Sequence, residues 1–157
     1  MSSVPKQHDH NKSIGKWIWM IDRHNISYIE KRLAPHGIGA GQFRYILLLH
    51  RNEGINQEQL SQLLELDKTT TARAVAKLLT LDIVQRETDP ADNRSYLIHL
   101  TTKGREMVPV IENILGESTE RMVKGFAPDD RKIFISYLTR VHDNLTNSRF
   151  DTGGDDE

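Results

Sequence analysis

Apolar residues recur at three- and four-residue steps through most of this chain, which is the spacing of one face of an α-helix. The first such stretch covers residues 12–34 and stops at Pro35 and Gly37, two residue types that end helices. Further helices are predicted from Ala40 to about Asn52, after Asn56, after Asp67, from Thr102 and from Pro128.

Two shorter stretches follow the pattern of strands. Residues 83–84 are apolar, and residues 96–100 alternate apolar side chains with other residues. Between them, residues 87–94 (ETDPADNR) are dense in turn-forming residues. The pattern predicts a β-hairpin with a polar loop over residues 87–94.

Capping residues separate the two short helices before this hairpin. Asn56 precedes the first helix, and Gln59 stands three residues later, which is the spacing of a capping box. Asp67 precedes the second, where its carboxylate can accept the free amide hydrogens of the first turn. Helix, turn, helix and hairpin in this order predict a winged helix.

The helix after Asp67 has two different faces. Thr71, Ala74, Val75 and Leu78 fall on one side at helical spacing. Small residues on the other side permit close approach to a surface, and hydroxyls and cations near the N-terminal half suit the major groove of DNA. The alternative is an ordinary surface helix with a few lysines, which the poor helix propensity of three consecutive threonines disfavours. The outward side carries Lys68, Thr69, Thr70, Ala72, Arg73, Ala76 and Lys77.

The end of the hairpin loop holds a carboxylate and an arginine two residues apart. Asp92 can hold the Arg94 guanidinium extended, ready for a narrow and negative minor groove. The alternative is a surface pair between Asp92 and Arg94 that stabilises little.

With these motifs in place, residues 12–146 resemble the MarR family (multiple antibiotic resistance regulators). The resemblance rests on Gln42-Phe43, on DKTTTARAVAKL (67–78), on Asp92-Asn93-Arg94 and on LTTKG (100–104). The chain departs from the family at Asp82, where glycine usually ends the recognition helix, and at Gly39, where serine or threonine usually caps. Aspartate tolerates the left-handed conformation and glycine is an acceptable cap, so neither departure threatens the fold.

The resemblance implies a mostly α fold with a small β-hairpin wing. It places a winged helix-turn-helix module at residues 39–104 and a helical dimerisation layer at residues 12–38 and 105–147. A hydrophobic content of 37% supplies few side chains for a core, which also favours burial of the outer helices in a homodimer. We expect disordered tails at residues 1–11 and 148–157.

The expected function is a repressor that binds a near-palindromic double-stranded DNA operator. Arg73 would contact base edges, assisted by Thr69 and Thr70, while Lys68 and Lys77 would contact phosphates. Arg94 would enter the minor groove, positioned by Asp92.

The resemblance also implies release by a small, anionic aromatic ligand between the dimer helices and the winged module. His24, Tyr28, Arg44 and Tyr45 would offer aromatic walls and a cation there. For each residue singly, interface packing or solvation is the simpler interpretation.

Composition limits the other functions. The net charge is −1, and residues 67–104 hold six Lys and Arg against five Asp and Glu, so a basic surface must come from arrangement. The absence of cysteine excludes disulfides and thiol redox sensing. No apolar run is long enough to span a membrane and no signal peptide is evident, so we expect a cytoplasmic protein without a membrane partner.

Catalysis and metal binding have weaker support. The chain contains no phosphate-binding glycine loop, serine elbow or HExxH motif, so we expect neither an enzyme nor a cofactor. His8 and His10 stand in the polar N-terminal stretch without a rigid third ligand. The alternative function is a metal-responsive regulator of the same fold, with the ligands drawn from His24, His36, His50 and His142.

Overall fold

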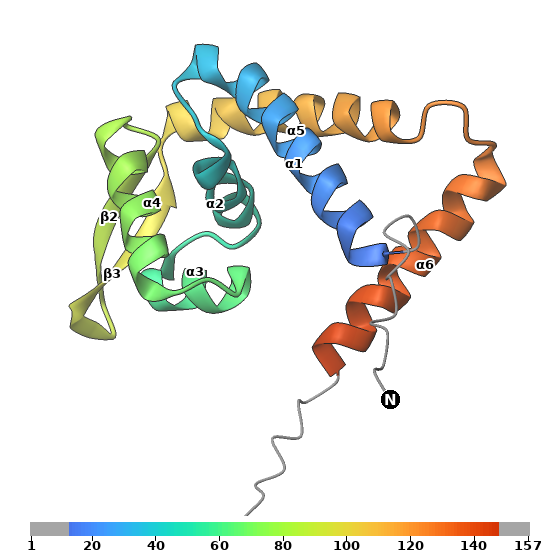
Figure 1. Ribbon diagram of the computed structural model, residues 1–157. Helices are drawn as coiled ribbons and strands as arrows, with labels where there is room; N and C mark the ends of the chain where they lie inside the picture. The colour runs from blue at the N-terminus through green and yellow to red at the C-terminus, as the bar shows by residue number, and fades with distance from the viewer. Residues whose placement is uncertain (1–12, 148–157) are drawn as a thin grey trace, which may run out of the picture. The chain divides into compact units, whose positions relative to one another are not determined.

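The structure is a computed structural model that describes residues 13–147, so the tails expected at residues 1–11 and 148–157 lie outside the described residues. It is mostly helical with one small sheet, as predicted (Figure 1). Residues up to Ser118 form one compact unit and those from Thr119 form another. In order, the elements are α1 (Ile14–Leu33), η2 (Ala34–His36), α2 (Ala40–Arg51), β1 (Ile55–Asn56), α3 (Gln57–Leu64), α4 (Lys68–Thr80), β2 (Val84–Asp89), β3 (Asp92–Leu100), α5 (Thr102–Met122) and α6 (Pro128–Asn147).

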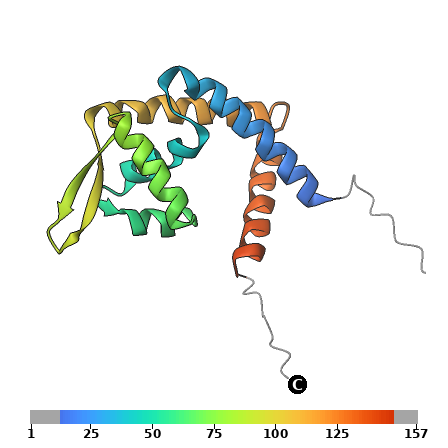
Figure 2. The ribbon, with the colours of Figure 1, turned by 60° about the vertical axis from the view of Figure 1, so that its left-hand side comes forward.

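The first unit contains a winged helix. Helices α2, α3 and α4 pack beside a three-stranded antiparallel sheet in the order β1-β3-β2. The β2–β3 hairpin projects beyond the helices (Figure 2). Its strands reach Asp89 and resume at Asp92, so the predicted polar loop over residues 87–94 is wrong in extent. Only Pro90 and Ala91 lie between the strands, because a tight turn needs few residues.

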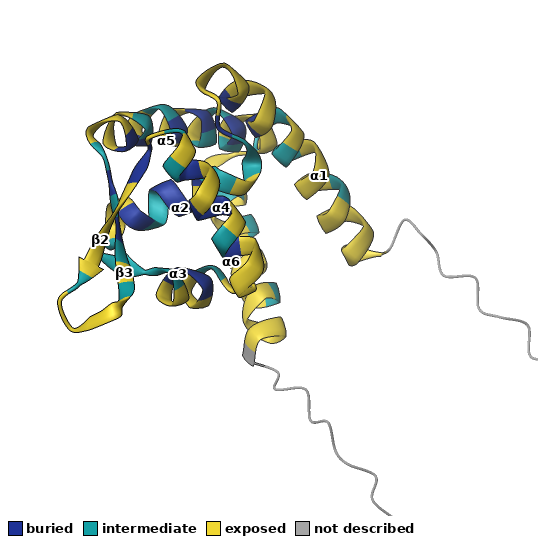
Figure 3. Ribbon diagram, turned by 90° about the vertical axis from the view of Figure 1, so that its left-hand side faces the viewer, coloured by how far each residue is buried: buried dark blue, intermediate teal, exposed yellow. Residues whose placement is uncertain are grey.

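The core of this unit lies where α2, α4 and the sheet meet (Figure 3). Ile46 and Leu49 of α2 are completely buried, as is Leu78 of α4. The sheet adds Ile98 and Leu100, which stand two apart on β3 and therefore share one face. The apolar alternation that predicted the strand thus gives it a buried side.

Helix α1 and the first part of α5 complete this unit. The C-terminal part of α1 buries Ile29 and Leu33, and α5 buries Ile111. Polar contacts join the two helices: the Tyr28 hydroxyl donates to Glu117 Oε2 at 2.9 Å, and Arg32 Nη2 lies 2.7 Å from the same oxygen. These contacts position the C-terminal part of α1 beside α5.

The second unit consists of the end of α5, a turn and α6. Phe126 and Phe134 meet edge to face with their ring centroids 5.6 Å apart. Arg131 Nη1 pairs with Glu120 Oε1 at 2.8 Å. None of the side chains described in α6 is buried, although its sequence has an apolar stripe. The rest of this unit therefore leaves the apolar stripe of α6 largely uncovered.

Candidate DNA-binding surface

The turn between α3 and α4 is built by its predicted caps. The Gln59 amide donates to Asn56 Oδ1 and the Asn56 amide donates to Gln59 Oε1, each at 2.9 Å, which confirms the capping box. Glu65 ends α3 in the left-handed conformation, with φ of 53°. The Thr70 amide then donates to Asp67 Oδ1 at 2.8 Å, which confirms the second cap. Each helix of the helix-turn-helix thus begins at a side-chain cap.

The side of α4 that the sequence predicts to be buried faces the core. Thr71, Ala74, Val75 and Leu78 are all buried. The Tyr45 hydroxyl lies 3.2 Å from Thr71 Oγ1, so the one polar group on this buried side has a partner. The opposite side, which carries the cations, must therefore point to solvent.

Arg73 and Lys77 are exposed on that outward side. Neither side chain forms an ion pair or hydrogen bond with another residue of the described part of the chain. Two cations one helical turn apart, free of intramolecular partners, are available to a polyanion. The outward placement is the one that the sequence predicts, and a contact of either side chain with DNA stays a prediction.

At the start of α4, unlike at Arg73 and Lys77, two of the predicted side chains already have partners within the protein. Lys68 Nζ lies 2.9 Å from Glu58 Oε1, and this contact holds the pKa of Glu58 below its ordinary value. The Thr70 hydroxyl donates to Asp67 Oδ2 at 2.6 Å and, with the Thr70 amide, lowers the pKa of Asp67. Thr69 is exposed. Of the residues predicted at this end, Lys68 and Thr70 would have to leave a partner or share it to contact DNA.

Asp92 does not hold the Arg94 guanidinium, and this corrects the predicted mechanism. Asp92 Oδ1 instead accepts a hydrogen bond from the backbone amide of Arg94 at 3.0 Å. A short carboxylate reaches an amide two residues on more readily than the end of a long side chain, as in an Asx turn. Asp89 does the same for the amide of Ala91, at 2.8 Å. Asp92 therefore shapes the backbone at the wing tip and leaves the Arg94 side chain exposed.

A second wing arginine was not singled out from the sequence. Arg86 of β2 is exposed, and its guanidinium carbon lies 5.8 Å from the centroid of the Tyr96 ring. Arg86 and Arg94 line the same hollow of about 260 Å³, beside Asn56, Gln57 and Glu58 at the start of α3. Arg94 and Tyr96 stand two residues apart on β3, so side-chain alternation places them on the same face of the strand. This alternation could have suggested from the sequence that Arg94 and Tyr96 lie close together.

The four residues predicted to bind a ligand do not form one site. Tyr45 is 1% exposed and belongs to the core, so the prediction that it lines a pocket is wrong. Its hydroxyl partner, Thr71, is distant in sequence and could not be foreseen from local pattern. His24 is exposed, Arg44 lies over the Phe43 ring at 5.6 Å, and Tyr28 binds Glu117.

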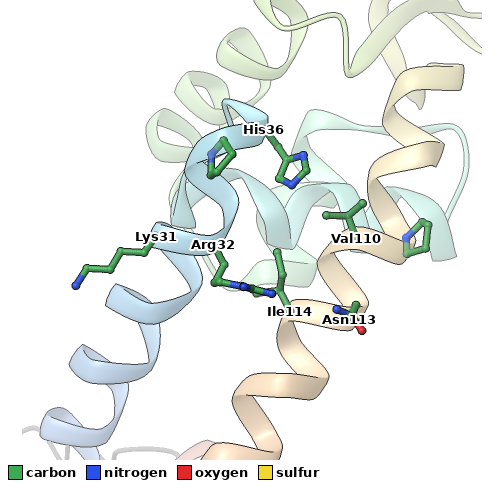
Figure 4. Close-up of a pocket in the computed structure, with 8 residues that line it drawn as sticks. Lys31, Arg32, His36, Val110, Asn113 and Ile114 are labelled. Atoms are coloured by element: carbon green, nitrogen blue, oxygen red, sulfur yellow. The ribbon is translucent and has the colours of Figure 1, made fainter.

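A different hollow lies between the end of α1 and α5, with a volume of about 640 Å³. Figure 4 shows Arg32 directed toward Ile114 of α5. His36 and Val110 lie on opposite sides of the opening, and Lys31 extends away from α5. It combines cationic and apolar walls. Its lining residues are Lys31, Arg32, Pro35, His36, Pro109, Val110, Asn113 and Ile114.

The histidines considered for a metal site are not gathered into one within the described residues. Within residues 13–147, no three His, Asp or Glu side chains lie close enough to hold a metal ion, so His24, His36 and His50 of the first unit do not form a metal site together. His142 Nδ1 instead lies 3.4 Å from Asp143 Oδ1. None of the described helices has the length and apolarity that crossing a membrane requires.

Comparison with known proteins places this geometry in a family. The model of the MarR family matches residues 36–95. A MarR transcriptional regulator from Methanosarcina mazei superposes with a TM-score of 0.77 at 40% identity, covering 85% of this chain and 96% of that one. A putative MarR family regulator from Listeria monocytogenes, crystallised with a 26mer DNA, gives a TM-score of 0.78 at 26% identity, covering 87% and 91%.

A curated relative supports the same assignment. YybA of Bacillus subtilis, an HTH-type transcriptional regulator, is 30% identical over 105 residues, which are 67% of this chain and 70% of that protein. These relatives are transcriptional regulators by name. This chain belongs to the MarR family of DNA-binding transcriptional regulators.

Proposed function

We propose that this protein is a homodimeric repressor that binds a near-palindromic DNA operator and is released by a small anionic ligand. The observation that carries the DNA-binding part is the outward placement of Arg73 and Lys77 on α4, free of partners in the described part of the chain. Its site of action is the cytoplasm, which holds the chromosome in the prokaryotic sources of the similar proteins.

Each predicted DNA contact has a defined role in this proposal. Arg73 contacts base edges in the major groove, with Thr69 and Thr70 beside it, because guanidinium and hydroxyl groups match the acceptors there. Lys77 contacts a phosphate. Lys68 does so once it leaves Glu58, and Arg94 enters the minor groove from the wing tip that Asp92 shapes.

Selection of bound fragments from random duplex DNA tests the operator. The recovered sites should contain two inverted half-sites about one helical turn apart, roughly 34–36 Å between centres. Arg73→Ala should bind the selected site about 1–3 kcal/mol more weakly and discriminate less against other sequences. Full discrimination by this variant would remove Arg73 from the base contacts.

Two exposed apolar faces support the homodimer, one in each unit. The N-terminal half of α1 and the stripe of α6 leave large side chains in solvent, and a soluble monomer rarely exposes contiguous apolar patches of this kind. A two-fold pair would cover each face and bring two copies of α4 to one operator. The exposed side chains are Ile14, Trp17, Ile18 and Ile21 on α1, and Ile133, Tyr137, Leu138 and Leu145 on α6.

The hollow between α1 and α5 supports the ligand. Its apolar walls suit an aromatic ring, and His36 at its edge suits a carboxylate, as does Arg32 if it shares its pairing with Glu117. A ligand releases DNA only if it binds the DNA-free conformation more tightly. Benzoate should therefore weaken DNA binding, whereas benzamide, which has a similar shape but no charge, should not. Equal effects of the two compounds would exclude recognition of the anion.

A further inference from the structure

The two faces of the wing carry opposite charges. Val84, Ile98 and Leu100 are buried at the root of the hairpin on its inner face. The register pairs Arg86 with Ile98, and directly opposed residues share a face, so Arg86 continues the inner face outward. Tyr96 and Arg94 follow on β3 by alternation. The inner face thus changes from an apolar root to a cationic and aromatic outer half.

The other face of the hairpin is different. Glu87 pairs with Leu97 in the register, and Gln85 pairs with His99. Glu87 Oε2 lies 3.3 Å from His99 Nε2, so the acid of this face is directed to a neighbour on the same face. A polyanion approaching the wing is therefore attracted to the inner face and not to the outer one.

Tyr96 has no role in the core that explains an aromatic ring there. It is 51% exposed, and its ring supports the Arg86 guanidinium at 5.8 Å. A cation over an aromatic face is attracted to it and loses some of its freedom. The Tyr96 ring thus restrains Arg86, and because Arg86 forms no ion pair within residues 13–147, its guanidinium remains available to an anion.

The inner face and the start of α3 enclose the hollow of about 260 Å³ that Arg86 and Arg94 line. We propose that a phosphate of the DNA backbone binds in this hollow, held by Arg86, with Tyr96 as the positioning residue and Arg94 in the adjacent minor groove. This subsite rests on the proposed DNA-binding function and adds a contact from a different strand of the wing.

Arg86→Gln tests the subsite directly. The variant should bind a duplex of about 30 base pairs roughly five- to tenfold more weakly at low salt, by a similar factor for selected and unrelated sequences. The log–log slope of its salt dependence should be shallower by about 0.9 for each phosphate that it no longer neutralises. Ethylation interference should disappear at particular phosphates, which a general reduction of positive charge would not cause.

Matched variants separate this role from a structural one. Lys124→Gln removes one charge from an exposed position in the second unit and should leave affinity and footprint unchanged. Tyr96→Leu should reproduce part of the Arg86→Gln defect, while Tyr96→Phe, which keeps the ring, should bind like the wild type. Thermal melts should be alike for all four variants because their side chains are exposed.

The outcomes distinguish the subsite from the function on which it rests. If the wild type binds the selected duplex but Arg86→Gln keeps its affinity, slope and footprint, the subsite is wrong and the proposed function stands. If the wild type binds no duplex, the proposed function and the subsite both fall.

Discussion

A single buried hydrogen bond fixes the rotation of α4 about its axis. Tyr45 and Thr71 are each almost completely buried, and their hydroxyl oxygens are 3.2 Å apart. Buried hydroxyls are costly without a partner, so α4 is most stable where this pair forms. That rotation directs Arg73 outward, which connects one core contact to the DNA-binding face.

Removal of this pair gives the first prediction. Tyr45→Phe should lower the free energy of unfolding by about 1–2 kcal/mol, because Thr71 then keeps an unpaired buried hydroxyl. Thr71→Val should lower the free energy of unfolding by a similar amount, because the Tyr45 hydroxyl then stays buried without a partner. The double variant should be less destabilised than the sum of the two, measured by urea unfolding. Strict additivity would show that the two hydroxyls do not interact.

The cap of α4 gives a dependence on pH. Hydrogen bonds from Thr70 lower the pKa of Asp67 in the folded protein, so the carboxylate stabilises the fold above its unfolded pKa. That contribution is lost as pH falls through the folded pKa, which is lower than the pKa of Asp67 in the unfolded chain.

Asp67→Asn isolates this effect, since asparagine also caps helices but does not titrate. The wild type should lose more thermal stability than Asp67→Asn between about pH 6 and pH 3. Melting curves by circular dichroism at both pH values measure this difference. Parallel losses in the two proteins would exclude a stabilising role of the Asp67 charge.

At the scale of elements, the sequence predicted features that depend on neighbouring residues and missed those that depend on residues far apart in the chain. Both caps and the buried side of α4 follow from residues within a few positions of one another. Strand β1 was missed because two residues carry no pattern, and its pairing depends on Ile98, far along the chain. Tyr45 was assigned to a pocket because its partner Thr71 lies on another helix. The contacts assigned to DNA remain predictions.

The contact between α3 and α4 should weaken DNA binding. Glu58 holds Lys68 and also lines the hollow of the wing, so it both occupies a cation and repels phosphates. Glu58→Gln should bind DNA several-fold more tightly at low salt. The gain should shrink as salt rises, because exposed charges are screened. Glu112→Gln on α5 removes an equal charge from an exposed position and is the control in the same titration. Unaltered affinity at low salt would refute this role of Glu58.

At the scale of the whole molecule, the proposed homodimer makes affinity depend on two copies of α4 reaching one operator. A single reading helix contacts one half-site, and linkage of two modules raises overall affinity by about 10²–10⁴ without any new contact. If the exposed stripe of α6 forms the interface of this homodimer, we expect its loss to weaken DNA binding as the loss of α4 contacts would. Leu138 is 45% exposed on that stripe and no described residue of α6 is buried, so its replacement should disturb the packing of a single chain only a little.

Leu138→Asp should consequently give a folded monomer with weak DNA binding. A carboxylate buried in the pair would lack a partner, which disfavours association much more than folding. Light scattering should report half the mass of the wild type, and affinity for the selected operator should fall by at least about 100-fold. Ser136→Asp adds the same charge on the opposite side of α6 and should remain dimeric. A Leu138→Asp protein that stays dimeric and binds normally would show that α6 does not form the interface.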